Sequence, residues 1–117
     1  MTEQEVASIR WALSDAFVDN EVDYAAIVRQ VEMFEASEVR RILYSEVAPV
    51  CHHNLECTLP SVWSCFGKEA LEDEIEEMLR RRKSSAVRRL LNTLHVKWLE
   101  YRYRYIWLEM VKFYGRG

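Results

Sequence analysis

The side chains best suited to chemistry gather in one segment, where two adjacent histidines stand among the three cysteines of the chain. Zinc takes four ligands, and paired cysteine ligands are usually separated by two to four residues. Here Cys51 and Cys57 are six positions apart, and Cys57 and Cys65 are eight positions apart. His52 and His53 are neighbours, so on a helix their side chains point about 100° apart. This spacing matches no standard zinc site, and we expect neither a metal nor another cofactor.

A cysteine beside a histidine also raises the question of a nucleophile and its base. Adjacent residues on a helix do not face each other, and no signature of a Cys–His hydrolase surrounds Cys51 and His52. The run from Asp73 to Glu77 could supply paired carboxylates, but an acidic run on an amphipathic helix usually forms its solvated face. There is no glycine-rich phosphate loop. We therefore expect a protein that is not an enzyme, with buried free thiols and surface imidazoles.

The composition predicts an all-α fold. The chain has 117 residues, of which 50% are hydrophobic and 30% charged, and it contains only 3 Gly and 2 Pro. A β-sandwich or barrel needs more turn residues than these. The length favours one compact domain over residues 1–117. No apolar run approaches the roughly 18 residues of a membrane span, and the acidic start lacks the layout of a signal peptide, so we expect a cytoplasmic protein that does not contact a membrane.

Hydrophobic periodicity predicts about five helices. The third helix has Ser37 as its N-cap and contains Pro49, which lacks a backbone N–H and should kink or stop the helix there. Three apolar side chains of the connector, Leu59, Trp63 and Phe66, are expected to be fixed to the core. Asp23 and Ser85 are candidate N-caps of the second and last helices. The expected helices cover residues 3–18, 23–35, 37–55, 68–82 and 86–113.

The last and longest helix carries two apolar stripes. One consists of Leu91, Leu94, Trp98, Tyr101, Tyr105 and Leu108, and the other of Leu99, Tyr103, Ile106, Met110 and Phe113. A helix that is apolar on two faces either sits centrally or offers one face to another chain. The sequence leaves both alternatives open.

Charge is distributed unevenly along the chain. Residues 1–38 contain nine acids and two bases, whereas residues 81–117 contain ten bases and two acids. One interpretation is structural: the basic last helix neutralises its acidic neighbours within the fold. The other is functional: an acidic face of the protein binds a basic partner. The candidate partner-binding residues lie around the second helix: Asp19, Glu21, Asp23, Glu32 and Glu35.

Glu46 is the one carboxylate in an otherwise apolar stripe that ends at Val50. A buried carboxylate needs a charged partner or several hydrogen bonds. The candidate partners are freed backbone N–H groups, the Trp63 side chain and a basic group such as Arg41. We interpret Glu46 as structural.

Three segments together resemble a family of small bacterial helical proteins known only as a domain of unknown function. They are Arg10–Asp19, Ile42–Cys51 followed by Asn54-Leu55, and Trp63–Phe66 before the helix with Leu71 and Ile75. The resemblance covers roughly residues 8–80, and the Glu-Val-Ala-Pro-Val-Cys run is its most specific part. It implies a bacterial origin and a compact helical fold.

The function that we expect from the sequence is binding. Small acidic helical bacterial proteins without a catalytic constellation are often immunity proteins, which bind and block a cognate toxin; this step is an association by class. The alternative is a nucleic-acid-associated regulator, because Arg102 and Arg104 interleave with Tyr101, Tyr103 and Tyr105 as a stacking surface would. The overall acidity, with a pI of about 5.6, argues against that alternative.

Overall fold

A helical run from Ala36 to Cys51 forms the centre of the protein. It consists of α3 (Ala36–Ile42), the π-helical turn η2 (Leu43–Val47) and α4 (Ala48–Cys51). We describe it from a computed structural model, which describes residues 2–17, 22–52 and 67–114. All of the regular elements in these ranges are helical, which confirms the all-α prediction.

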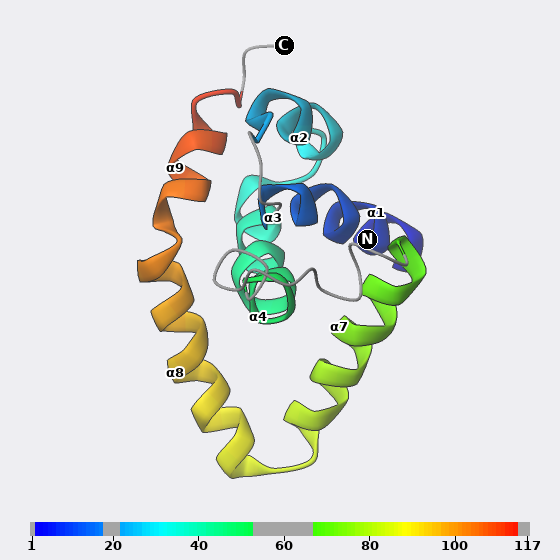
Figure 1. The fold of residues 1–117 in the computed structure, drawn as a ribbon, viewed down its shortest axis with the longest axis vertical. Coiled ribbons are helices and arrows are strands. Elements are labelled where there is room, and N and C mark those ends of the chain that lie inside the picture. Colours follow the sequence, from blue (N-terminus) through cyan, green and yellow to red (C-terminus); the bar gives the residue numbers. More distant parts are fainter. Residues whose placement is uncertain (1, 18–21, 53–66, 115–117) are drawn as a thin grey trace.

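The other helices surround this run (Figure 1). In that view α1 and α7 lie on its right, α8 and α9 on its left, and α2 above it, while α7 and α8 converge below into a hairpin. The turn at Ser84-Ser85 joins these two helices. The bounds are α1 (Glu3–Ser14) with the 3-10 turn η1 (Asp15–Phe17), α2 (Tyr24–Val31), α7 (Lys68–Lys83), α8 (Ala86–Arg102) and α9 (Arg104–Val111).

Side-chain caps fix the starts of three helices. The Thr2 hydroxyl accepts a hydrogen bond from the Glu5 N–H, and the Glu5 carboxylate accepts one from the Thr2 N–H, which completes a capping box. Asp23 accepts from the Ala26 N–H at 3.0 Å, and Ser85 accepts from the Arg88 N–H at 3.4 Å. The two predicted N-caps, Asp23 and Ser85, are therefore confirmed.

The start of α3 differs from the prediction. Ser37 lies inside the helix, and Glu35 is the N-cap residue without a side-chain cap. The Ser37 hydroxyl instead donates to the Glu35 carboxylate at 2.9 Å. An N-cap oxygen accepts a backbone N–H of the first turn from a position before the helix, whereas Ser37 is the second residue of α3, so it does not mark the start of the helix.

The irregularity predicted at Pro49 takes the form of a π turn directly before the proline, and the helix does not stop there. The Ala48 N–H bonds to the Leu43 carbonyl five residues earlier, and the helix then continues past Pro49 to Cys51. Pro49 has no N–H for the Ser45 carbonyl. The Arg82 side chain on α7 supplies the donor instead, because Nη2 bonds to that carbonyl and Nη1 lies 3.2 Å from the Ser45 hydroxyl.

The single long helix predicted for residues 86–113 is interrupted at Tyr103, where φ is −112° and ψ is 25°. The Tyr44 hydroxyl donates to the Tyr103 carbonyl at 2.9 Å and accepts a hydrogen bond from the Trp107 N–H. In a continuous helix this N–H and this carbonyl would bond directly. Burial raises the pKa of Tyr44 to about 12, although the bond from Trp107 opposes this shift. A side chain inserted in this way separates two helices.

The core is one cluster of side chains from every helix around the central run. Phe17 and Tyr103 meet edge to face, with ring centroids 5.9 Å apart. Three of the side chains expected in the core, Leu59, Trp63 and Phe66, lie outside the described residues. The largest fully buried side chains are Ile9, Leu13, Phe17, Ile27, Ile42, Leu43, Leu71, Ile75, Leu99, Tyr103, Ile106 and Met110.

Replacing Tyr44 by Phe tests the insertion. The change removes one oxygen, so the Trp107 N–H loses its partner and the buried Tyr103 carbonyl keeps only its hydrogen bond from the Ile106 N–H at 3.1 Å. We expect the free energy of unfolding to fall by about 1–3 kcal/mol, measured by urea denaturation. Tyr101→Phe is the matched control, since Tyr101 is 69% exposed. A Tyr44→Phe protein as stable as the parent would show that the helix closes the direct bond without loss.

Candidate interaction surfaces

The buried polar site of the protein is an ion pair between Arg10 on α1 and Glu46 on η2. Both residues are only 6% exposed. Arg10 donates from Nε at 2.8 Å and from Nη2 to the same Glu46 oxygen, and Arg41 donates to the other oxygen at 2.9 Å. The prediction that Arg41 is a partner of Glu46 is confirmed; the second and more buried partner, Arg10, was not predicted.

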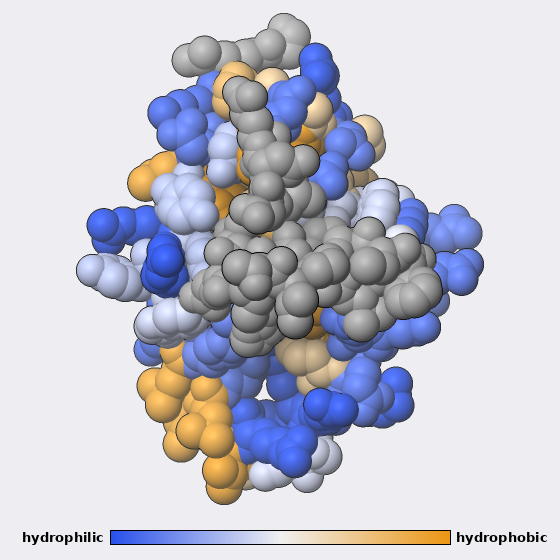
Figure 2. All heavy atoms as spheres, in the orientation of Figure 1, coloured by the Kyte–Doolittle hydropathy of each residue, from blue (hydrophilic) through white to orange (hydrophobic). Residues whose placement is uncertain are grey.

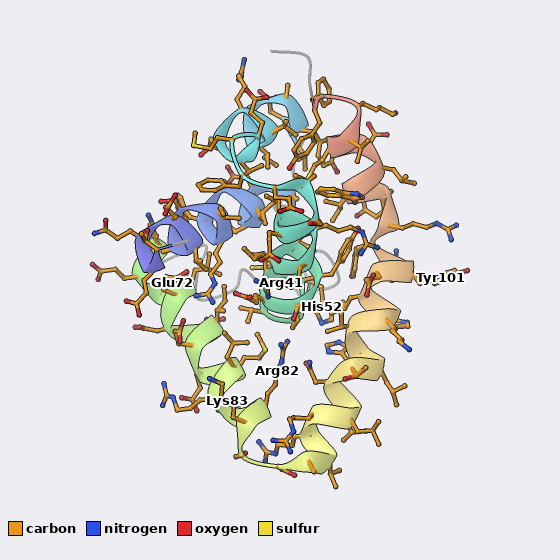
Figure 3. All side chains as sticks on the ribbon, turned by 180° about the vertical axis from the view of Figure 1, so that it is seen from behind. Arg41, His52, Glu72, Arg82, Lys83 and Tyr101 are labelled. Atoms are coloured by element: carbon orange, nitrogen blue, oxygen red, sulfur yellow. The ribbon has the colours of Figure 1, made fainter. Side chains whose placement is uncertain are left out.

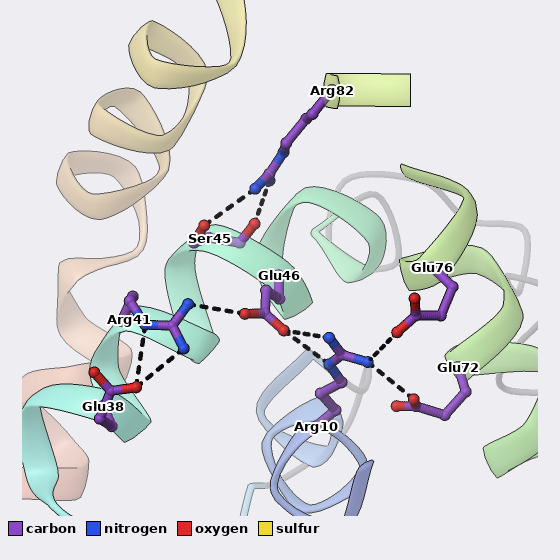
Figure 4. A network of polar contacts seen from close by, with 8 residues as sticks. All are labelled: Arg10, Glu38, Arg41, Ser45, Glu46, Glu72, Glu76 and Arg82. Carbon is purple, nitrogen blue, oxygen red and sulfur yellow. Dashed lines mark hydrogen bonds and ion pairs between the residues drawn. The ribbon is translucent and has the colours of Figure 1, made fainter. Parts of the chain in front are cut away.

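The network extends from this pair in two directions (Figure 4). Nη1 of Arg10 lies 2.9 Å from both Glu72 and Glu76 on α7, and Arg41 continues to Glu38 at 3.0 Å. Burial opposes the charge of Arg10, but its hydrogen bonds to Glu76 and Glu46 outweigh this effect and raise the pKa of Arg10 above its usual value. The arrangement joins α1, the central run and α7 through opposite charges.

The spacing of residues in the first helix predicts that Arg10 faces the core, although a search for hydrophobic residues alone does not find it. Val6, Arg10, Leu13 and Phe17 are spaced by four, three and four residues, so Arg10 occupies a core-facing position of its helix. A cation at such a position requires a buried anion. Glu46 is the corresponding anion in the stripe of the third predicted helix.

A cleft of about 770 Å³ opens between α7 and α8 beneath the end of the central run. Its walls combine apolar side chains with both signs of charge. Burial raises the pKa of Glu74, and burial lowers the pKa of Arg82. Its lining residues include Pro49, Val50, Glu74, Met78, Arg82, Arg88, Leu91 and His95.

Cys51 and His52 are both buried, so the expected surface imidazole is wrong for His52. The His52 ring lies 5.4 Å from that of His95 and 5.9 Å from that of Trp98, and it therefore links α4 to α8. Burial raises the pKa of the Cys51 thiol well above its usual value, which favours the uncharged thiol. His53, Cys57 and Cys65 lie outside the described residues.

Within the described ranges, no cluster of three or more His, Cys, Asp or Glu side chains could hold a metal ion. None of the helices described is long and apolar enough to cross a membrane.

The acidic set predicted for partner binding is only partly described. Asp19 and Glu21 lie outside the described residues. Asp23, Glu32 and Glu35 are exposed at the two ends of α2 and at the start of α3, and none of them forms an ion pair with another described residue. The structure therefore brings three charges to the surface around one short helix.

The two apolar stripes of the C-terminal segment differ in their burial. Leu99, Tyr103, Ile106 and Met110 are at most 1% exposed, whereas the other stripe faces outward. Of the ten large hydrophobic side chains that are exposed in the described part of the chain, nine belong to α8 and α9. We call these nine the apolar stripe: Val87, Leu90, Leu91, Leu94, Trp98, Tyr101, Tyr105, Leu108 and Val111.

The apolar stripe is accessible along one edge of the molecule. Figure 2 shows its aliphatic part as an orange patch at the lower left, over the N-terminal half of α8. Figure 3, seen from behind, shows Tyr101 pointing away from the body, whereas His52 lies between the central run and α8. Sequence periodicity identified the stripe but not which of the two faces would be buried.

Fold and surface together define a small all-α protein that is held by a buried charge network and exposes one apolar helix face. The family described as a domain of unknown function, DUF7079, matches residues 4–113, and the chain therefore belongs to it. The match includes the basic C-terminal helices. Neither a curated protein nor a solved structure matches the chain.

Replacing Arg10 by Met tests the buried network. The change leaves the Glu46 carboxylate buried beside Arg41 alone, and we expect the free energy of unfolding to fall by about 3–5 kcal/mol in urea denaturation. The double replacement Arg10→Met/Glu46→Met should recover part of this loss, because it removes both buried charges. Arg29→Met is the control at an exposed arginine. A double variant less stable than either single variant would contradict the pairing.

Proposed function

We propose that this chain is a non-catalytic protein-binding inhibitor, and specifically a bacterial immunity protein that neutralises a cognate toxin. The single observation that carries the binding role is the apolar stripe on α8 and α9. Scattered exposed apolar side chains are ordinary on a protein surface. A contiguous row of them marks an interaction surface.

The apolar stripe has the composition of a binding hot spot. It includes Trp98 and two tyrosines, and aromatic residues dominate the binding energy of many interfaces. Trp98 is 44% exposed and is supported from beneath by His52 and Tyr103. A ring held in this way loses little conformational freedom when a partner covers it.

The acidic residues at the ends of α2 supply a second, electrostatic contribution. Asp23, Glu32 and Glu35 are exposed, and α2 packs against α9. A partner that covers the end of the apolar stripe therefore approaches these carboxylates. Complementary charge mainly accelerates association, while buried apolar contacts slow dissociation. Asp19 and Glu21 belong to the same proposed set.

The toxin-neutralising role rests on similarity to a class of proteins and not on any particular residue of this chain. The chain is small, acidic overall and helical, as many immunity proteins are. A gene for a large secreted toxin beside the gene for this chain would support the proposal, and a neighbourhood of metabolic enzymes would count against it.

A second candidate function is that of a nucleic-acid-associated regulator. One observation favours it: the Arg104 guanidinium lies 4.9 Å from the centre of the exposed Tyr101 ring, and Arg102 lies 5.1 Å from that of Tyr103. Arginine and aromatic side chains together bind single-stranded nucleic acid. The acidic N-terminal half opposes this role, since it repels the same phosphates.

Placing a charge in the apolar stripe tests the binding role. The purified chain is titrated with the product of the neighbouring gene, and both the affinity and the inhibition of that product are measured. Leu94→Glu should weaken the complex by about 30-fold or more, as expected for a hot-spot position. Met33→Glu is the matched control, because Met33 is 76% exposed but lies outside the stripe. Equal losses in both variants, or none in either, would contradict the assignment.

Reversing the acidic set tests its role in association. Glu32→Lys and Glu35→Lys combined should slow association with the same partner by about tenfold or more and change dissociation less, measured by stopped-flow fluorescence. Asp23 is left unchanged in this variant because its carboxylate caps α2.

The same preparations separate the two candidate functions. A salt-sensitive, submicromolar complex with random RNA or DNA, abolished by Arg88, Arg89, Arg102 and Arg104 to Ala, would favour the nucleic-acid regulator. We expect no such complex tighter than roughly 10⁻⁵ M at physiological salt.

A further inference from the structure

The apolar stripe contains a regular seam. Seven of its nine residues follow one another at intervals of four, three, four, three, four and three positions, an average of 3.5. This is the spacing with which one helix packs along another. Each of these seven side chains is at least 44% exposed, so the whole seam is available. The seam consists of Val87, Leu91, Leu94, Trp98, Tyr101, Tyr105 and Leu108.

The positions directly beside the seam are occupied mainly by cations. One flank contains Arg88, His95 and Arg102 and ends at Glu109, and the other contains Leu90, Lys97 and Arg104. These are the positions that pair with charges on a second helix and select the partner. None of the four flanking cations Arg88, Lys97, Arg102 and Arg104 forms an ion pair within the described part of the chain; other basic residues do, for example Arg40 with Glu100.

The flanking charges disfavour a second copy of this chain. In a parallel pair of helices, Lys97 of one copy would face Arg102 of the other, and only Arg104 would meet an acid, Glu109. In an antiparallel pair each flank meets the same flank of the other copy, so Lys97 would face Arg104 and His95 would face Arg102, and only Arg88 would meet an acid, Glu109. Like charges placed opposite each other in an interface cost binding energy.

The narrowness of the seam favours a helix over a membrane surface as its binding partner. The seam residues of α8 fall within a stripe about as wide as a coiled-coil contact, and the charged side chains of Arg88, Lys97 and Arg102 lie beside it, with Leu90 as the apolar flanking position. Its length from Val87 to Leu108 corresponds to about 32 Å of helix. One partner helix of similar length covers it.

We infer that α8 and α9 bind an amphipathic helix of the partner that carries carboxylates on both sides of its own apolar seam. This inference rests on the proposed binding function and names the chemistry of the segment that is bound; the acidic residues around α2 meet a separate, basic part of the same partner. Side chains of Asp or Glu on that helix pair with Lys97 and Arg104 on one flank, and with Arg88 and Arg102 on the other.

Two synthetic peptides of 25 residues test the inference. Both have the same leucine seam, and the flanking positions are all Glu in one and all Lys in the other. Each is fluorescently labelled and used at nanomolar concentration, and binding to the full chain is followed by anisotropy. The Glu-flanked peptide should bind at least tenfold more tightly at low salt, and the ratio should shrink as salt screens the flanking charges.

Three variants sharpen this test. Lys97→Glu/Arg104→Glu should reduce the preference for the Glu-flanked peptide or reverse it, because both side chains are exposed and flank the seam. Leu94→Glu should abolish binding of that peptide, while Met33→Glu should retain it. Circular dichroism confirms that each variant remains helical. Equal binding of the two peptides, or tighter binding of the Lys-flanked one, would overturn the inference.

Two further results would also overturn it. One is a concentration-dependent dimer of the chain alone that Leu94→Glu dissociates in analytical ultracentrifugation. The other is sedimentation with phosphatidylserine vesicles that exceeds binding to either peptide. Failure of the inference is distinguishable from failure of the proposed function: a neighbouring-gene product that requires Leu94, with no preference between the peptides, removes only the inference. A clear peptide preference without inhibition of that product removes only the toxin-neutralising role.

Discussion

The buried charge of Glu46 is the constraint on which the arrangement of the helices depends. A carboxylate removed from water must be paired, and the energy of an unpaired one is prohibitive. Arg10 and Arg41 approach it from different elements, and Arg10 also reaches Glu72 and Glu76 on α7. The position of α1 relative to the central run and to α7 is therefore specified by directional contacts. Apolar packing alone would allow these helices to slide.

A second arginine serves the same central run in a different way. Pro49 removes the backbone donor that the Ser45 carbonyl would otherwise have, and Arg82 from α7 donates to that carbonyl. Arg82 therefore adds a direct link between α7 and the segment where the helix is irregular. Two successive residues of η2, Ser45 and Glu46, are thus held by three arginines.

Local patterns in the sequence identified the helices, two caps and the need of Glu46 for a basic partner, because periodicity and capping depend on near neighbours. The break at Tyr103 could not be derived in this way, because it involves Tyr44, which is distant in sequence. Pro49 indicated an irregular helix, but local patterns do not reveal that Arg82 donates to the Ser45 carbonyl. The same limit applies to the two apolar stripes, since periodicity reveals both and only the packing decides which is buried. Arg10 was overlooked because its charge hid a core-facing position.

The hydroxyl of Tyr44, inserted between Tyr103 and Trp107, also affects how the outer surface is wound. A seam with a repeat of seven drifts around a straight α-helix by about 20° per repeat, and long seams of this kind therefore force the helices that share them to supercoil. Interrupting the backbone at Tyr103 divides the seam, so that the part on α8 drifts by only about 40° from Val87 to Tyr101. The break therefore limits the length of uninterrupted α-helix over which this drift accumulates, and it lies where Tyr44 of the central run meets the outer helices.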